Sequence, residues 1–218
     1  IDPGGPRAVA VIGEHKPGRI AFWGTYDLGK PRNRILIQGL RENGFEVIEC
    51  RRDLWQGIED KSRMFGKRAR LRPVLSMTLR WLFAYPRLIW RYLRLPAHDL
   101  VLVGYLAQLD VLVLRPFAWL RGVPLVWDTF LSLHDTVVDD RALVSPRHPA
   151  ALLLYAWEWL ALRSADLLLV DTLAHGRFFA ERFGVAPERI SRVLVGAEPR
   201  AFYPPSTDRA SGPYRVLF

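Results

Sequence analysis

The sequence predicts an α/β protein built on a doubly wound parallel sheet. Six short apolar runs are spaced along the chain, and stretches with helical periodicity separate them. Strands that alternate with helices form parallel sheets, because each helix carries the chain back to the end where the previous strand began. The predicted strands cover residues 19–23, 45–50, 99–103, 123–128, 166–170 and 190–195. We expect them in the spatial order 3-2-1-4-5-6.

The first strand, its loop and the next helix organise the rest of the prediction. The apolar run 19–23 stops at a loop, 24–30, that holds two glycines. Pro31 then takes the first helical position, where its missing N–H has no helical partner. The start of this helix carries Arg32 and Arg34. Free backbone N–H groups and the positive end of the helix dipole favour an anion there, commonly a phosphate.

The later helical stretches continue the alternation. The predicted helices cover residues 73–95, 106–121, 150–164 and 172–183. Residues 129–149 are irregular, which is long for a connection in a compact domain and indicates a functional loop. Its Asp135, Asp139 and Asp140 have no spacing typical of metal ligands, so we expect a solvated loop and no metal.

The basic excess is confined to one segment. The formal charge is +9, and ten basic residues but no acidic residue lie between Lys61 and His98. The other 21 basic residues face 22 acidic ones. An anionic partner is therefore expected at this segment and not across the whole surface.

The predicted helix 73–95 in this segment is amphipathic and basic. At 100° per residue its arginines fall on one narrow face, and leucines, tryptophans and other apolar residues cover the rest. Three interpretations follow: a core helix with one hydrated face, a helix in a membrane interface, or a nucleic-acid surface, which the lack of a recognised nucleic-acid-binding motif disfavours. We expect an anionic membrane surface and no nucleic acid as partner. The residues predicted to face the membrane are Arg80, Arg87, Arg91, Arg94, Trp81 and Trp90.

Two further features of the sequence bear on localisation. No uncharged apolar run reaches the roughly 18 to 20 residues that span a bilayer. Cys50 is the one cysteine, so it permits no intrachain disulfide and favours a reducing compartment. We therefore expect a cytoplasmic protein, peripheral at the inner face of the cell membrane.

Three motifs, in their order and spacing, resemble the N-terminal lobe of a family 4 glycosyltransferase with the GT-B architecture, which is Rossmann-like. They are the loop and helix start 24–34, the strand 166–170 followed by Thr172, and the hinge-like stretch 193–198 with Phe202 and Pro204. The hinge departs from the family pattern, because Val195 and Glu198 stand where relatives have asparagine and aspartate.

Composition and the resemblance together predict a division into domains, with the tail and the linker indicated by their Gly, Pro and Ser content. Residues 1–18 are a tail or linker, 19–195 a Rossmann-like N-terminal glycosyltransferase domain, 196–213 an interdomain linker, and 214–218 the first strand of a missing C-terminal domain. In this family the N-terminal lobe holds the acceptor, and the C-terminal lobe holds most of the donor. We therefore expect this chain alone to be inactive.

The resemblance also implies a reaction, transfer of a sugar to a lipid-linked or polysaccharide acceptor with retention of anomeric configuration. The donor is a nucleotide sugar, which is a substrate, and no cofactor is expected. Many relatives carry a histidine just after the fourth strand; here Asp128 holds that place, with His134 six residues on, and these two are the predicted catalytic residues. The alternative for Asp128 is a cap for the loop that follows. The expected donor-phosphate or acceptor loop comprises Gly24, Thr25, Tyr26 and Arg32.

A second function class stays open, a non-catalytic Rossmann-like module that binds a membrane surface or a partner protein. The coding sequence beyond Phe218 discriminates, because a further domain with paired glutamates favours the enzyme. A dinucleotide-dependent oxidoreductase is disfavoured, since no G-x-G-x-x-G follows the first predicted strand.

Overall fold

The computed structural model describes residues 18–53 and 71–198, with the backbone alone described over 71–79. Several predictions lie outside these residues: the tail up to residue 17, the linker beyond residue 198, and the last strand. The hinge residues Phe202 and Pro204 lie outside them as well.

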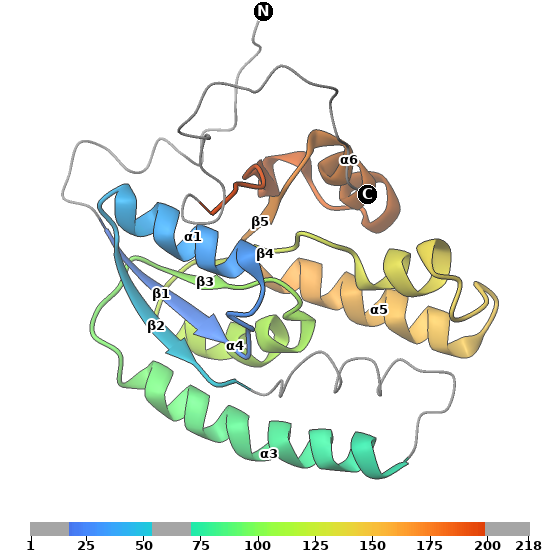
Figure 1. Ribbon diagram of the computed structural model, residues 1–218, viewed down its shortest axis with the longest axis horizontal. Helices are drawn as coiled ribbons and strands as arrows, with labels where there is room; N and C mark the ends of the chain where they lie inside the picture. The colour runs from blue at the N-terminus through green and yellow to red at the C-terminus, as the bar shows by residue number, and fades with distance from the viewer. Residues whose placement is uncertain (1–17, 54–70, 199–218) are drawn as a thin grey trace, which may run out of the picture.

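A sheet of six parallel strands forms the centre of the protein (Figure 1). Five helices longer than two turns accompany the strands in the described part of the chain. The alternation of strands and helices confirms the predicted α/β class with a doubly wound parallel sheet. The strands are β1 (Arg19–Gly24), β2 (Glu46–Arg51), β3 (Leu100–Val103), β4 (Leu125–Asp128), β5 (Leu167–Val170) and β6 (Ile190–Arg192).

The predicted strand order is wrong at one place. The observed order is β2-β1-β3-β4-β5-β6, so β3 pairs with β1 and not with the far side of β2. The side chains explain the difference: β2 carries Glu46 and Glu49 and is mostly half-exposed, as suits an edge, whereas all but the first residue of β3 are buried. The chain therefore reverses its direction of winding between β1 and β3.

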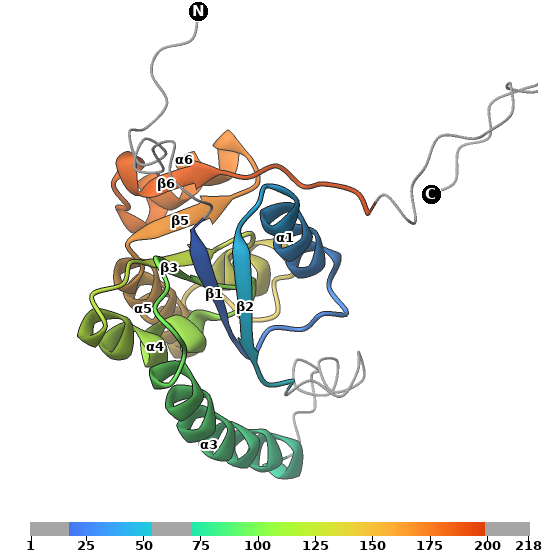
Figure 2. The ribbon, with the colours of Figure 1, turned by 90° about the vertical axis from the view of Figure 1, so that its left-hand side faces the viewer.

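The helices divide between the two faces of the sheet. Figure 2 shows α1 (Pro31–Glu42) on one side of the strands and α3, α4 and α5 on the other. The handedness of βαβ crossovers accounts for this division, because β1 to β2 runs in the opposite direction across the sheet from all later steps. The other elements are α3 (Leu71–Leu93), α4 (Gln108–Leu120), α5 (Pro149–Ser164), α6 (Leu173–Phe183), a π-helical turn (Asp135–Asp140) and a 3-10 turn (Pro187–Arg189).

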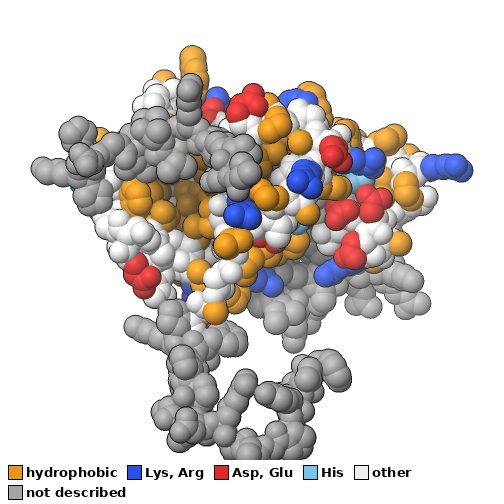
Figure 3. Space-filling view, turned by 90° about the horizontal axis from the view of Figure 1, so that it is seen from above, with side chains coloured by type: hydrophobic (Ala, Val, Ile, Leu, Met, Phe, Trp, Pro, Cys, Tyr) orange, Lys and Arg blue, Asp and Glu red, His pale blue; other side chains and the backbone are white. Residues whose placement is uncertain are grey.

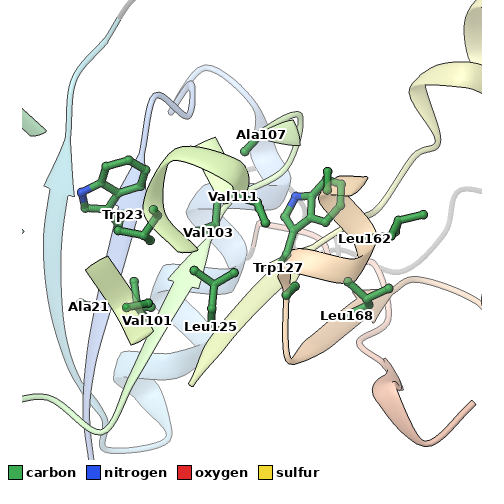
Figure 4. Close-up of a cluster of buried hydrophobic side chains, with 14 of the residues drawn as sticks. Ala21, Trp23, Val101, Val103, Ala107, Val111, Leu125, Trp127, Leu162 and Leu168 are labelled. Atoms are coloured by element: carbon green, nitrogen blue, oxygen red, sulfur yellow. The ribbon is translucent and has the colours of Figure 1, made fainter. Parts of the chain in front are cut away.

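Successive side chains of a strand point to opposite faces of the sheet, so each strand contributes to two separate hydrophobic cores. Ile20 and Phe22 pack with Ile37 of α1. Ala21 and Trp23 point to the opposite face, into the larger core beneath α3, α4, α5 and α6. Figure 4 shows this larger core, in which the following residues are labelled: Ala21, Trp23, Val101, Val103, Ala107, Val111, Leu125, Trp127, Leu162 and Leu168.

The inner side of α3 closes the larger core over β1 and β2. The indole Nε1 of Trp23 donates a hydrogen bond to the carbonyl oxygen of Leu88 at 3.4 Å. Cys50 of β2 lies under the same carbonyl with no exposed surface, and burial raises the pKa of its thiol. The long helix is therefore attached to the sheet along its second half.

Within the described residues, no helix is both long and apolar enough to cross a membrane. The same part of the chain holds no group of three or more His, Cys, Asp or Glu side chains arranged to bind a metal ion.

Candidate active site at the carboxyl edge of the sheet

The predicted donor loop and Asp128 lie at the same edge of the sheet. Gly24 is the last residue of β1 and Asp128 is the last residue of β4. Both strands pair directly with β3, and both pairings are parallel. The reversal between β1 and β3 is the topological switch point of this sheet, and ligands of open α/β sheets bind beyond the carboxyl ends of strands at such a point. The site is therefore built from the loops that leave β1, β3 and β4.

The loop after β1 is held by a carboxylate that the sequence prediction missed. The backbone N–H of Thr25 donates to Oδ2 of Asp110 at 2.6 Å, and the Thr25 hydroxyl lies 3.1 Å from both Asp110 oxygens. Tyr85 of α3 donates its hydroxyl to Oδ1 of Asp110 at 2.7 Å. A Cβ atom on Gly24, whose φ is +133°, would lie 2.4 Å from Oδ2 of Asp110. Only glycine fits at this turn.

Asp110 is buried at the first turn of α4. Burial raises its pKa to about 6, although the hydrogen bonds from Thr25 and Tyr85 favour the charged form. In the sequence, Asp110 is marked only by its position in the first turn of the helix after β3, where a negative charge interacts favourably with the helix dipole. Thr25, a predicted donor-loop residue, thus has its N–H committed to the protein interior.

Tyr26 turns away from the edge and into the core beneath α1. Its ring packs edge-on against Phe22, with centroids 4.6 Å apart, and its hydroxyl lies 3.3 Å from Oε2 of Glu49. Burial, with the charge of Glu49, raises the pKa of the phenol. The described contacts of Tyr26 are therefore those of a core residue, and its role toward a donor or acceptor stays a prediction.

A buried ion pair joins α1 to the end of β4. Arg32 Nη2 lies 2.7 Å from Oδ1 of Asp128, and Arg32 Nε lies 2.8 Å from Oδ2. The exposed fraction is 9% for the Arg32 side chain and 0% for that of Asp128. Burial raises the pKa of Asp128, against the opposing hydrogen bonds and charge of Arg32. The guanidinium also lies 4.6 Å from the centroid of the Phe130 ring and donates to the carbonyl of Val193.

Asn33, next to Arg32, bridges the two loops that flank the switch point. Its Oδ1 accepts the N–H of Tyr105 at 3.2 Å, and its Nδ2 donates to the carbonyl oxygen of Asp27 at 3.0 Å. A Cβ on Gly104 would lie 2.8 Å from Oδ1 of Asn33, so the loop after β3 can approach α1 only with glycine there. The sequence analysis did not select Asn33, because its partner across the switch point, Tyr105, lies 72 residues away in the chain.

Arg34 joins the same helix to the extended residues 193–198. Its Nε lies 2.6 Å from Oε1 of Glu198 and its Nη2 lies 3.0 Å from Oε2. Arg34 also donates to the carbonyl oxygen of Leu28. The hydrogen bond from Arg34 lowers the pKa of Glu198. Both arginines at the start of α1 therefore hold the chain that leaves β6.

His134, the second predicted catalytic residue, contacts α5, α6 and Asp139 of the π-helical turn, whose Oδ2 lies 3.7 Å from its Nδ1. Its ring lies edge-on to Tyr155 and Phe183, with centroids 5.6 and 6.4 Å away. Its backbone N–H donates to Oε2 of Glu158 at 2.9 Å, and this buried glutamate also binds the loop residue Ser132. None of the described interactions brings His134 to the ion pair of Arg32, so its catalytic role stays a prediction.

His175 lies in the first turn of α6, beside Asp171, which follows β5. His175 Nδ1 is 2.9 Å from Oδ1 of Asp171, and Thr172 caps α6 by accepting the His175 N–H at 3.2 Å. Partial burial acts to raise the pKa of Asp171, but the hydrogen bond and charge of His175 outweigh it and the net shift is downward. The charge of Asp171 in turn contributes to the raised pKa of Asp128.

The outer side of α3 bears apolar and basic residues side by side. The side chains of Leu82, Phe83, Trp90 and Leu93 are 63%, 60%, 55% and 42% exposed. Three of the predicted membrane-facing arginines, Arg87, Arg91 and Arg94, are exposed, and Arg80 is half-buried. Trp90 is exposed, whereas Trp81 is only partly exposed, on the side of the helix that turns toward the protein; contact of either with a membrane stays a prediction.

Comparison with known proteins gives matches among solved structures alone. No family model matches the chain, and no curated protein matches it. Among solved structures, the fold is similar to that of HepE from Anabaena, which was crystallised in complex with UDP and glucose. The sequences are 15% identical, the TM-score is 0.46, and the match covers 84% of this chain and 46% of HepE. The chain thus spans less than half the length of that protein.

Proposed function

We propose that this chain is the acceptor-side domain of a retaining glycosyltransferase that moves a sugar from a nucleotide sugar to a lipid-linked or polysaccharide acceptor. The observation that carries the proposal is the meeting of the β1 loop and the Arg32–Asp128 pair at the switch point of the sheet. Two of the stretches that carry the resemblance, 24–34 and 193–198, meet at this edge, where Arg32 donates to the carbonyl oxygen of Val193. A donor-binding lobe following residue 198 would complete the site.

In this proposal, the residues at the carboxyl edge have separate roles in binding the diphosphate of the donor. The tight turn at Gly24 lets the backbone approach the donor closely, and Arg32 supplies a positive charge near the developing charge on the leaving phosphate. Asp128 has no exposed surface, so it acts as a positioning residue that fixes the guanidinium plane of Arg32. The bond from the sugar to the phosphate oxygen breaks, the bond to the acceptor hydroxyl forms, and the hydroxyl proton leaves with the phosphate.

The acceptor is proposed to be reached at the membrane surface, on its cytoplasmic side. Exposed Trp90 and exposed arginines on α3 support this, because tryptophan and arginine together suit the headgroup level of a bilayer. Each cation near an anionic surface contributes about 1 kcal/mol. The partners in this proposal are a nucleotide sugar, a glycan or lipid-linked acceptor and anionic lipid.

One observation favours the non-catalytic module as a second candidate. The Thr25 N–H and the Asp128 carboxylate are both occupied by partners within the protein. An edge whose polar groups are satisfied internally can serve as a rigid scaffold for docking. In that case the protein binds a membrane or a partner without transferring a sugar.

Donor binding and transfer by the product of the complete gene distinguish the two candidates. Calorimetric titration with UDP, GDP and ADP sugars should show saturable binding of one class, and radiolabelled sugar should pass to a lipid extract. Arg32→Lys keeps the charge but loses the two-pronged contact with Asp128, so it should weaken donor binding or turnover. Arg177→Lys on the exposed side of α6 is the matched control. An intact protein that binds no sugar nucleotide overturns the enzymatic proposal.

A further inference from the structure

We infer that the outer surfaces of α3, α4 and α5 together form one docking face for a bilayer that contains anionic lipid. This inference rests on the proposed function and extends its membrane contact well beyond α3. The docking face comprises Leu82, Phe83, Trp90, Leu93, Trp119, Leu120, Leu152, Leu153, Trp159 and Leu160, with Arg87, Arg91, Arg94 and Arg163.

The evidence from α5 is an apolar side that points to solvent. Leu152 and Leu153 are 66% and 71% exposed, and Leu160 is 49% exposed. At 100° per residue these positions and Trp159 fall within one arc, on the side opposite the buried Glu158 and Leu162. A surface helix of a soluble domain normally carries polar residues on this side. The outer side of α5 is therefore built for an apolar partner.

The C-terminal end of α4 connects α5 to α3. Trp119 and Leu120 are 76% and 69% exposed there. Arg121 follows them and donates to the carbonyl oxygens of Tyr92 and Leu95 at 2.7 and 2.9 Å, which ties the end of α4 to the end of α3. Since α4 packs against both neighbours, the three exposed patches belong to one layer of helices (Figures 1 and 2).

The charge on this face has a single sign. The three helices contain two acidic residues, Asp110 and Glu158, and each is 1% exposed and bonded inside the protein. Two arginines stack on exposed tryptophans: Arg94 over Trp90 at 3.8 Å and Arg163 over Trp159 at 3.7 Å from the ring centroid. By contrast, acidic and basic side chains are interspersed on the side seen in Figure 3, away from α3.

This combination selects a lipid surface over a second copy of the chain. A two-fold dimer brings the same patch to itself, so the arginines of this face would meet arginines with no carboxylate between them. A bilayer with anionic headgroups offers negative charge and apolar depth at every point of contact. Docking in this way places the helical layer on the membrane and turns α1 away from it.

Sedimentation with vesicles tests the docking face. The 218-residue chain should bind vesicles of phosphatidylcholine with 30% phosphatidylglycerol at least about tenfold more tightly than neutral vesicles, because several arginines contribute. The triple variant Leu152→Ser, Leu153→Ser, Leu160→Ser should lose about tenfold or more in affinity, although it leaves every arginine in place. Leu173→Ser, which removes a 60% exposed leucine from α6, is the control and should bind like the parent.

Each other outcome overturns the inference. Equal vesicle binding by the triple variant and the parent excludes α5 from the face, provided both unfold at the same urea concentration. A parent dimer that the triple variant abolishes in sedimentation velocity assigns the face to self-association, and capture of an acidic protein in preference to vesicles assigns it to that protein. Nucleotide-sugar titration of the complete gene product separates the two proposals, because lost vesicle binding with intact donor binding counts only against the docking face.

Discussion

The guanidinium of Arg32 and the carboxylate of Asp128 face each other at 2.7 Å across the carboxyl edge of the sheet, although 96 residues separate them in the chain. The pair connects the first turn of α1 with the end of β4, and β3 lies between β1 and β4. Two of the predicted site residues thus form one unit.

Removal of one partner from this pair should be costly. Arg32→Met should lower the free energy of unfolding by about 3 to 5 kcal/mol, because it leaves a buried carboxylate without compensation. The double variant Arg32→Met with Asp128→Leu should recover most of the loss, since no charge remains to be desolvated. Urea unfolding followed by circular dichroism measures both. A loss below about 1 kcal/mol in the single variant contradicts a buried pair.

The turn at Gly24 should tolerate no side chain. Gly24→Ala should destabilise the protein by about 2 kcal/mol or more, from the positive φ and the contact with Asp110. Gly39→Ala, within α1 and with open space around its Cβ, should instead stabilise by about 0.5 to 1 kcal/mol. Thermal unfolding compares the two; similar melting temperatures would mean that the β1 loop adapts freely.

Stability should depend on pH through Asp110. Its pKa is about 6 in the folded protein and near 3.8 when exposed, so the folded state binds more protons between these values. The free energy of unfolding should therefore fall as pH rises from about 4 to about 6 and then level off. Asp110→Asn should remove this contribution, which appears as a changing difference between the two unfolding curves. A constant difference from pH 4 to pH 7 refutes the assignment.

The hydroxyl of Tyr85 should contribute strongly to the stability of the fold. Tyr85→Phe should cost about 1.5 to 3 kcal/mol, because the lost hydrogen bond goes to a buried carboxylate. Tyr155→Phe removes a hydroxyl that donates to the exposed carbonyl of Arg182 at 2.8 Å and should cost about 1 kcal/mol or less. Equal losses in chemical unfolding would show that Asp110 does not depend on Tyr85.

Local pattern was enough to predict most of the elements. The apolar run before Gly24 and Pro31 at the next helix start correspond to β1 and α1 as observed. The strand order could not be predicted from local pattern, because it depends on which strand lies at the edge of the sheet. The charged residues of β2, Glu46 and Glu49, carry that information.

The candidate site was predictable only in outline. The rule that ligands bind at carboxyl ends of parallel strands selected Gly24 and Asp128 correctly as residues of one edge. It could not predict the contacts of Asp110 with Thr25 or of Asn33 with Tyr105, because these join residues 85 and 72 positions apart and leave no periodic trace. Long-range pairing of polar side chains is set by packing, which one sequence does not display.

The single thiol of the chain is a built-in reporter of helix detachment. Cys50 lies under Leu88 with no exposed surface, so an alkylating reagent reaches it only when α3 lifts from β2 or the chain unfolds. The labelling rate of the unmodified protein therefore measures how often that helix comes loose. Measuring the labelling rate of Cys50 with and without vesicles would report how lipid affects the detachment of α3, without an engineered fluorophore.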